Sequence, residues 1–487
     1  MKVYPNTFLL SLLSLPSGEH QFLGRGPIHC APVGHTQGTM NWAPTDVDSL
    51  CKLRHAPYIT GPLVDPSPSS SYRFSQRVMP ILALFILLLP FGITACSSSS
   101  SSNTNGTVLR FGAPISLTGA TSKEGQLVLE GYKLWVKEVN AHGGIRVGDT
   151  TYQVQLKYYD DGSSPTKSAQ LTQQLVTSDK VNFLLGPYGT AATLQDEAIA
   201  EQYKIPMVEG NGSANAIFSK GFHYIFGVLS PAHEYAKVML EAMLTLPNPP
   251  KTIAIISADD AFSREVAIAA KDYAASHDLN VVYYQQYPAD TTDLTSVLTA
   301  LSASGPGGTA PDMLLGSGHE SEAVTIMKES KQLHINTKLY AFTVGPDLPD
   351  FISVLGPTAN YVVGSSQWTP QEKYNGVDVF ATPANYTQIY KAEYRHLPSF
   401  QSAQSSAVGL AFQYAIQKAG SIDPQKVRNA LASLDIMTFY GEIRFDASGA
   451  NIYKPMALIQ IQNENVVTVY PSTIANANLL YPAPPLL

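Results

Sequence analysis

Small and hydroxyl-bearing residues follow two consecutive apolar runs of the sequence. In FLLGPYGTAATLQDEA (183–198) the apolar run ends at a Gly-Pro corner, and Thr190 opens a helix-forming pattern. The loop EGNGSANA (209–216), which contains Ser213, follows the next apolar run in the same way. A helix that begins directly after a strand presents free backbone N–H groups and the positive end of its dipole. The two loops therefore predict a cradle for a carboxylate or a similar small polar group, and helix capping is the alternative role of the hydroxyls.

Other polar residues lie where they could join such a site. Glu209 ends the strand beside the cradle, and we expect either a ligand contact or a solvated loop carboxylate. Trp368 is expected either at the rim of a cleft or in the core. Gln404 and its neighbours Gln401 and Ser402 precede a predicted helix at 405–418 and could reach a cleft.

Two acidic pairs invite comparison with catalytic dyads. They are Asp160-Asp161 and Asp259-Asp260, and each follows a predicted strand. Adjacent residues at a strand end point to opposite sides, so the two carboxylates of a pair do not converge on one substrate atom. We therefore interpret both pairs as capping groups of loops.

The sequence contains none of the common enzyme signatures. GxSxG, HExxH, P-loop and CxxC motifs are absent, and APISLTGATSKEG (113–125) stands where a dinucleotide fingerprint would follow the first strand. The three cysteines, Cys30, Cys51 and Cys96, all precede the globular body, which therefore has no disulfide framework or thiol nucleophile. No His, Cys, Asp or Glu set has metal-ligand spacing. We expect no enzymatic activity, no cofactor and no metal.

Apolar runs alternate with amphipathic stretches from Val108 onward. A chain of 487 residues exceeds what one hydrophobic core usually supports, and the alternation restarts after FGVLSP (226–231). Alternating strands and helices indicate parallel sheets covered by helices. We predict an α/β fold of two doubly wound parallel-sheet lobes, with ligands at the carboxyl ends of the strands. Strands are expected at 108–116, 152–161, 181–186, 205–210, 252–257, 280–287, 312–317, 338–343, 361–368 and 441–450.

The region before the body predicts export. MPILALFILLLPFGITA (79–95) is apolar, and Arg73 and Arg77 precede it. A positive region, a short apolar run and a small-residue boundary describe a secretory signal, and the run is short for a membrane-spanning helix. We assign 73–95 to the signal peptide.

The boundary itself, ITAC (93–96), resembles the bacterial lipobox, in which the cysteine is lipidated. Cys96 would then be the first mature residue and carry a lipid anchor, with 96–106 as a Ser-rich polar tether. Residues 1–72 lack periodicity, and we expect a disordered leader or a wrongly assigned start. The net charge of −7, without a dense Lys/Arg run, argues against nucleic acid as a partner.

Several stretches, taken in order, resemble the type 1 periplasmic binding proteins, and more narrowly their branched-chain amino acid (leucine/isoleucine/valine) binding family. The resemblance covers nearly all of 108–470, and its order and spacing are more specific than any one motif. The matching stretches are APISLTGATSKEG (113–125), EVNAHGGI (138–145), YYDDGSSPTKSAQ (158–170), LLGPYGTAAT (184–193), IPMVEGNGSA (205–214), SADDAFSRE (257–265), YPADTTDLT (287–295) and FYGEIRFDASG (439–449).

The resemblance implies lobes that exchange the chain three times. The first lobe would comprise 107–229 plus 366–436, and the second 230–365 plus 437–471, with a C-terminal tail at 472–487. The three crossings near Leu229, Gly364 and Tyr440 would form a hinge.

The resemblance also implies a set of ligand-binding residues. Thr190 takes the place of the family's hydroxyl ligand, and Asn211 with Ser213 matches a pair that uses a backbone carbonyl, a hydroxyl and an N–H. Thr343 aligns with the acidic residue that binds the ligand's ammonium, so Glu209, Glu320 or a ligand without a free amine would have to replace that contact. The full set is Glu124, Tyr188, Gly189, Thr190, Glu209, Asn211, Gly212, Ser213, Phe262, Gly318, His319 and Thr343.

Members of this family are solute receptors of ATP-driven importers that close two lobes around a ligand. The resemblance therefore implies a monomeric, lipid-anchored extracytoplasmic receptor that presents an amino acid or related small carboxylate to a membrane permease. A branched-chain amino acid, an amide, a keto acid and an aromatic acid all remain open as ligands. A sensory receptor of the same fold, which signals occupancy to a partner protein, is the alternative function.

Overall fold

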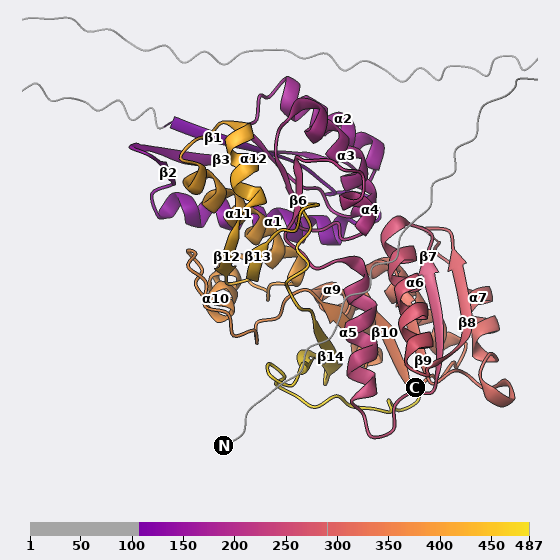
Figure 1. The fold of residues 1–487 in the computed structure, drawn as a ribbon. Coiled ribbons are helices and arrows are strands. Elements are labelled where there is room, and N and C mark those ends of the chain that lie inside the picture. Colours follow the sequence, from indigo (N-terminus) through magenta and orange to yellow (C-terminus); the bar gives the residue numbers. More distant parts are fainter. Residues whose placement is uncertain (1–106, 290, 487) are drawn as a thin grey trace, which may run out of the picture. The chain divides into compact units, whose positions relative to one another are not determined.

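The computed structural model describes residues 107–289 and 291–486. The predicted leader, signal peptide and tether, together with Cys96, lie outside the described residues. Two large sheets and one small one organise the described chain (Figure 1). This arrangement confirms the predicted α/β fold.

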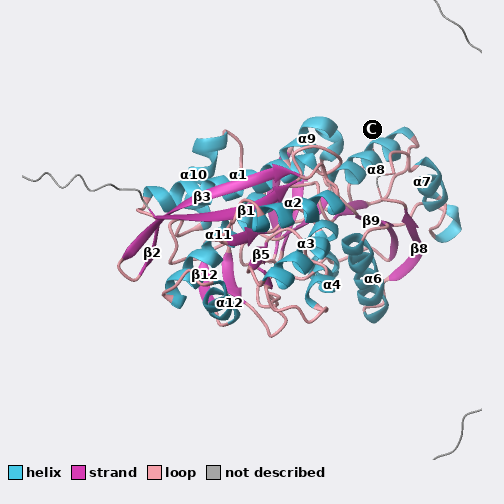
Figure 2. Cartoon of the chain, turned by 90° about the horizontal axis from the view of Figure 1, so that it is seen from above, coloured by secondary structure: helices cyan, strands magenta, loops and turns pink. Residues whose placement is uncertain are grey.

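The first sheet has the strand order β2-β3-β1-β4-β5-β6 and is parallel except for β2. Phe183 and Leu185 pack on one face of this sheet, and Leu184 between them packs on the other, as the strand period of two requires. Both faces are therefore covered by helices (Figure 2). The strands are β1 (Thr107–Ile115), β2 (Ile145–Val147), β3 (Thr150–Asp160), β4 (Phe183–Leu185), β5 (Met207–Glu209) and β6 (Ile225–Gly227), and the main helices are α1 (Ser122–Ala141), α2 (Pro165–Thr177), α3 (Thr190–Tyr203) and α11 (Phe400–Ala419).

The second sheet has the order β15-β14-β11-β10-β9-β7-β8, and β14 runs antiparallel to both of its neighbours, β11 and β15. Ile253 and Ile255 of β7 pack with two helices on one face, whereas Ala254 and Ile256 pack on the other. The strands are β7 (Thr252–Ala258), β8 (Asn280–Tyr287), β9 (Met313–Ser317), β10 (Leu339–Phe342), β11 (Val363–Ser366), β14 (Ala457–Gln462) and β15 (Asn465–Tyr470), and the helices are α5 (Ala232–Leu244), α6 (Ala261–Ser276), α7 (Thr295–Ser302), α8 (Glu320–Gln332) and α9 (Pro349–Leu355).

Shorter elements complete the described chain. The small antiparallel sheet pairs β12 (Asp435–Thr438) with β13 (Gly441–Arg444). The remaining helices are α4 (Asn215–Phe218), α10 (Pro383–Tyr394) and α12 (Pro424–Ala432), and two 3-10 turns lie at Pro306–Gly308 and Gly356–Ala359.

Both large sheets reverse their strand order at one point. In the first sheet β1 and β4 are neighbours, and in the second β7 and β9 are neighbours. Helices leave to opposite faces at such a point, which opens a crevice at the carboxyl ends of the strands. The loops after β4, β5, β7, β9 and β10 all begin at these ends.

Three segments that pass between the sheets are tied to one another. Ser230 donates its backbone N–H to Oε1 of Gln367 at 2.9 Å, and Nε2 of Gln367 donates to the Ser230 carbonyl at 2.9 Å. The Ser230 hydroxyl donates to the Lys454 carbonyl at 2.7 Å, and the Lys454 ammonium donates to the Gln367 carbonyl. We propose that the hinge lies at these three positions.

The segment after Tyr440 differs from the expected lobe boundary. Ile443 and Phe445 belong to the core around the first sheet, and Gly227 of β6 forms a parallel bridge with Ala450. We therefore propose that the third crossing lies at 451–456, after the segment 441–450 that the resemblance had assigned to the second lobe.

Candidate functional site

A cavity of about 20 Å³, which we call the inner cavity, lies where loops from the two large sheets meet. The loops after β4 and β5 line it from the first sheet, and those after β7, β9 and β10 from the second. Helices α5 and α11 complete the wall. The lining residues are Tyr188, Gly189, Thr190, Asn211, Ser213, Tyr235, Phe262, His319, Val344, Phe400 and Gln404.

Aromatic rings form much of this wall. Tyr235 and Phe262 pack edge to face with centroids 5.1 Å apart, and Phe262 lies 6.0 Å from the His319 ring. Tyr188 reaches His319 from the other lobe, with ring centroids 5.7 Å apart. Rings at these distances favour an aliphatic or aromatic ligand body over a strongly hydrated one.

The polar side of the inner cavity is built by the two loops that the sequence singled out. Helix α3 begins after Gly189, whose φ of 85° suits glycine. The Thr190 hydroxyl does not cap its own helix but accepts the backbone N–H of Ala214 at 3.4 Å, which joins the two loops. Thr190 and Ser213 are both only 3% exposed. Two hydroxyls thus face a closed space together with a helix N-terminus.

Two amides fix one another beside these hydroxyls. Nε2 of Gln404 donates to Oδ1 of Asn211 at 2.7 Å, and the Asn211 amide donates to the Ser405 hydroxyl at 3.0 Å. The Tyr440 hydroxyl donates to Oε1 of Gln404 at 3.2 Å. Because both amides are held in one orientation, their remaining donors and acceptors can select among ligands.

Glu209 lies beneath these loops and does not line the inner cavity. Its side chain is fully buried, and Oε1 accepts the backbone N–H groups of Asn211 and Gly212, the latter at 2.8 Å. Oε2 accepts the Thr193 hydroxyl at 2.8 Å. Burial raises the pKa of Glu209 to about 7 despite these donors. Neither the expected ligand contact nor a solvated carboxylate describes this arrangement.

A second cavity of about 80 Å³, the outer cavity, adjoins the first and shares Tyr188, Gly189, Thr190 and His319 with it. The Tyr188 hydroxyl and Nδ1 of His319 are 3.0 Å apart, and this contact joins the two lobes. Because both residues line both cavities, the contact separates the inner cavity from the outer one. The other residues that line the outer cavity are Ser116, Thr121, Ser163, Pro165, Ala191, Ala192 and Asp260.

Further contacts tie the lobes together around the inner cavity. The Glu265 carboxylate on α6 accepts the backbone N–H of Asn215 at 2.9 and 3.1 Å. The backbone N–H of Phe400 donates to Oδ2 of Asp347 at 3.2 Å, and Lys123 pairs with Asp350. The structure therefore has its lobes in contact, which is the closed arrangement.

Three carboxyl groups gather at this interface with few cations. Burial raises the pKa of Glu124. It also raises the pKa of Glu320 and the pKa of Asp347, each to about 7. Glu124 and Glu320 both raise the pKa of Asp347 further, because like charges oppose its ionisation. His319 lowers the pKa of Glu124, and Lys123 lowers that of Glu320, without offsetting the effect of burial.

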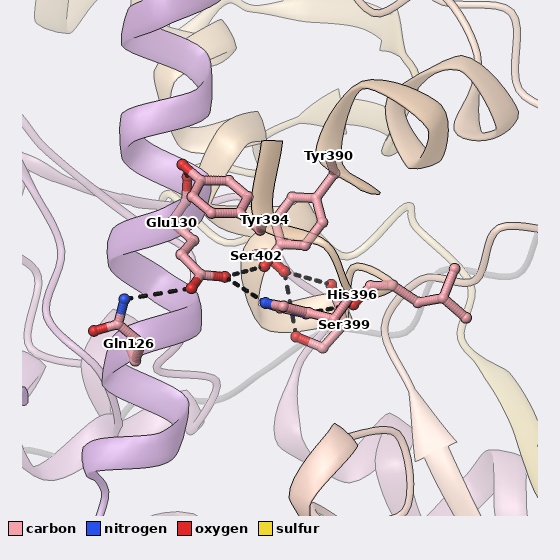
Figure 3. Close-up of polar contacts among 8 residues, drawn as sticks. Gln126, Glu130, Tyr390, Tyr394, His396, Ser399 and Ser402 are labelled. Atoms are coloured by element: carbon pink, nitrogen blue, oxygen red, sulfur yellow. Dashed lines mark hydrogen bonds and ion pairs between the residues drawn. The ribbon is translucent and has the colours of Figure 1, made fainter. Parts of the chain in front are cut away.

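A polar network lies beside the start of α11, whose first five residues include Phe400 and Gln404 (Figure 3). The Tyr390 hydroxyl donates to the Glu130 carboxylate, and Nε2 of His396 lies 3.2 Å from the same oxygen. The Tyr394 hydroxyl donates to the Glu130 carbonyl at 3.0 Å. These contacts connect α1, α10 and the loop that leads into α11.

Most of the predicted site residues meet at the inner cavity. Tyr188, Gly189, Thr190, Asn211, Ser213, Phe262, His319 and Gln404 line it, and Glu124, Glu209, Gly212, Gly318, Thr343 and Trp368 do not. Thr343 instead bonds both the N–H and the carbonyl of Gly318, at 3.1 and 2.8 Å. The Trp368 side chain is buried, and its indole N–H donates to the Phe439 carbonyl at 3.1 Å.

Three lining residues, Tyr235, Val344 and Phe400, were missed by the sequence reasoning. Tyr235 lies on α5 and Phe400 in the first turn of α11. From the sequence alone, an apolar residue at such a helix position is interpreted as part of the hydrophobic core. Val344 directly follows the aligned Thr343, and an alignment shift of one residue would have found it. Asp347, which contacts Phe400, was also missed.

The described ranges contain neither a candidate membrane-spanning helix nor a candidate metal-binding cluster. Among residues 107–289 and 291–486, no helix combines the length and apolar character needed to cross a membrane. In the same ranges, no three His, Cys, Asp or Glu side chains are grouped so that they could hold a metal ion.

The chain matches known proteins over most of the described residues. The sequence profile of one family, described as periplasmic binding protein, matches residues 108–465. The Leu/Ile/Val-binding protein homolog 8 of Brucella abortus (strain 2308) is 26% identical over 402 residues, covering 77% of this chain and 93% of that protein.

Solved structures share the fold. LivJ, the branched-chain amino acid transporter substrate-binding protein of Streptococcus pneumoniae in complex with isoleucine, has a TM-score of 0.64 at 21% identity, covering 75% of this chain and 100% of that one. An ABC transporter solute-binding protein of R. palustris in complex with benzoate has a TM-score of 0.63 at 17% identity, covering 77% and 99%.

Proposed function

Because the chain belongs to the periplasmic binding protein family, a family of binding proteins and not of enzymes, we propose that it is the solute-binding receptor of an ABC importer. It captures an amino acid or a related small carboxylate outside the cytoplasm and presents the closed form to membrane permease subunits. Relatives whose names or titles describe Leu/Ile/Val-binding and ABC-transporter proteins support this proposal.

The inner cavity is the observation that carries the proposal. Its lining comes from both lobes, and the Tyr188–His319 contact closes it between them. A ligand that touches both lobes binds the closed state more tightly than the open one and so shifts the population toward closure. The permease then reads ligand occupancy as lobe closure.

The lining narrows the ligand to a small molecule with an apolar body and one polar head group. Thr190, Ser213 and the N-terminus of α3 suit the head group, and the rings of Tyr235 and Phe262 suit the body. No Asp, Glu, Lys or Arg lines the inner cavity. Branched-chain amino acids, their keto acids and amides, and aromatic acids are therefore the classes to test.

We also propose that Cys96 carries a lipid anchor that holds the receptor at the outer face of the cell membrane. The ITAC sequence and the serines that follow it support this proposal. The intact mass of the protein isolated from its native membrane tests it: we expect a chain that begins at an acylated Cys96, and residues retained before Cys96 would contradict the anchor.

A ligand screen tests the receptor function. Thermal shift and calorimetry with leucine, isoleucine, valine, their keto acids and amides, and substituted benzoates should yield at least one strong stabiliser. X-ray scattering without and with that ligand should show compaction, because the ligand closes the lobes. The proposal would be refuted if no ligand in the panel bound, or if the scattering profiles without ligand and at saturation with ligand were identical.

A further inference from the structure

We infer that Glu209 selects ligands by the charge of the head group. It favours an uncharged head group, such as a carboxamide, and admits a carboxylate only together with a proton that Glu209 takes up from solvent. This inference rests on the proposed function, because it concerns the ligand of the inner cavity, and it adds a specificity residue that does not line that cavity.

The first support is the position of the Glu209 carboxylate between the two cradle loops. Oε1 accepts the N–H groups of Asn211 and Gly212, and Oε2 accepts the Thr193 hydroxyl. The same hydroxyl lies 2.9 Å from the Gly189 carbonyl. A Cβ on Gly186 would lie 2.1 Å from Oε2, so the carboxylate packs directly against the loop after β4. Glu209 thus joins both head-group loops from below.

The second support is the charge of the described groups around this carboxylate. Asp196 on α3 and the Tyr132 hydroxyl on α1 both interact electrostatically with Glu209, and neither is cationic. Helix α11 carries no charged residue from Phe400 to Gln417, and neither cradle loop contains Lys or Arg. Lys220 pairs with Glu197 at 2.7 Å.

The third support is a count of the donors left for a ligand. The Asn211 and Gly212 N–H groups are used by Glu209, and the Ala214 N–H is used by Thr190. The cradle therefore offers fewer N–H groups than its backbone contains. An anionic head group would also stand in the same buried region as an ionised Glu209, and two like charges oppose one another's ionisation.

One outcome of this conflict is proton uptake. When a carboxylate ligand binds, one proton moves from solvent to Glu209, so that only one negative charge is buried. Burial has already raised the pKa of Glu209 to about 7, so this protonation is accessible near neutral pH. A carboxamide ligand buries no charge and requires no such transfer.

The variant Glu209→Gln isolates the charge. The amide oxygen of Gln can accept both backbone N–H groups, as Oε1 does. The amide nitrogen, in the place of Oε2, can donate to the Thr193 hydroxyl, whose own proton then points to the Gly189 carbonyl. Glu201→Gln is the matched control, because Glu201 also accepts two backbone N–H groups, of His223 and Tyr224, but lines neither cavity.

The experiment compares ligands of equal shape and different charge in the full-length receptor. Affinities for 4-methylpentanoate and its amide, and for benzoate and benzamide, are measured by calorimetry at pH 8. We expect Glu209→Gln to raise the affinity for the carboxylate relative to its amide by about tenfold or more, the equivalent of one pKa unit. Glu201→Gln should leave that ratio unchanged.

Calorimetry in buffers of different ionisation enthalpy adds a second readout. In the wild type at pH 8, binding of the carboxylate should be accompanied by uptake of about one proton more than binding of its amide. This difference should vanish in Glu209→Gln. Protons exchanged by closure itself cancel in the comparison, because both ligands close the lobes.

The outcomes separate the two claims. The inference is overturned if the wild type and Glu209→Gln show the same ratio of carboxylate to amide affinity and the same proton uptake. That result would leave the receptor function intact. If neither the wild type nor Glu209→Gln binds any of the four ligands or any member of the wider panel, the receptor function is overturned, and the inference with it.

Discussion

The backbone N–H of Glu320 on α8 donates to Oε1 of Glu124 on α1 at 3.3 Å, and the Glu124 carboxylate raises the pKa of the Glu320 carboxyl from the opposite lobe. Asp347 lies close enough for both to raise its pKa. Opening the lobes would return all three groups to water, where their pKa values are about 4. Closure is therefore coupled to proton binding.

The sign of this coupling gives the first prediction. The closed-state pKa values of Glu320 and Asp347 are raised to about 7, so their contribution to closure is fully present near pH 4 and is lost as pH rises through about 7. Affinity for an uncharged ligand should fall between pH 6 and pH 8. Glu320→Gln should flatten that profile, and a wild-type affinity that rises with pH would contradict the coupling.

The Tyr188–His319 contact predicts a change in ligand release. Tyr188→Phe keeps the ring in the wall of the inner cavity but removes the hydroxyl that bridges the lobes. A hydrogen bond of this kind contributes about 1 kcal/mol, so dissociation should accelerate roughly fivefold while association changes little. Stopped-flow fluorescence measures both rates, and an unchanged dissociation rate would show that the contact does not retain the ligand.

The cradle hydroxyls predict losses of affinity without loss of the fold. Thr190→Ala and Ser213→Ala should each weaken binding by about 1–3 kcal/mol, because each removes a buried hydroxyl that faces the inner cavity. Thr193→Ala is the contrasting variant, since its hydroxyl contacts Glu209 and Gly189 but does not line that cavity. Calorimetry measures the affinities, and full affinity in both cradle variants would exclude this site assignment.

The parts of this structure that follow local rules could be predicted from the sequence. Ser164 followed by Pro165 is a local signal for the start of a helix, and in α2 the Ser164 hydroxyl accepts the Lys167 N–H at 3.4 Å. The cradle loops were found because Gly-rich turns between an apolar run and a helix are local signals as well. Asp260 likewise caps α6, as interpreted, by accepting the N–H of Phe262 at 2.9 Å.

The parts that depend on tertiary packing could not be predicted. Tyr235 and Phe400 face the inner cavity only because two lobes meet there. The sequence pattern of their helices would be the same if both residues were buried in a hydrophobic core. Glu209 was weighed as a ligand contact or a solvated group, and its burial beneath the loops depends on Gly186 and Thr193 from another segment. A single sequence carries no signal for such long-range neighbours.

The proposed hinge predicts a large loss of stability at one residue. Gln367 bonds both the N–H and the carbonyl of Ser230, and its carbonyl accepts the Lys454 ammonium. Gln367→Ala leaves two buried backbone groups of Ser230 unpaired, which should cost about 2–5 kcal/mol in the free energy of unfolding. Gln173→Ala on the exposed side of α2 is the control, and chemical denaturation should show a change within about 0.5 kcal/mol there.

Thr343 distinguishes a structural role from a ligand contact. The resemblance aligns it with an ammonium-binding acid, yet its hydroxyl bonds both backbone groups of Gly318 and does not line the inner cavity. Thr343→Ala and the isosteric Thr343→Val should therefore each lower the free energy of unfolding by about 1–3 kcal/mol, because the buried groups of Gly318 lose their partner. The rank order of ligands in the screen should stay the same in both variants. A reordered panel, with stability unchanged, would place Thr343 in contact with the ligand and restore the role that the alignment implied.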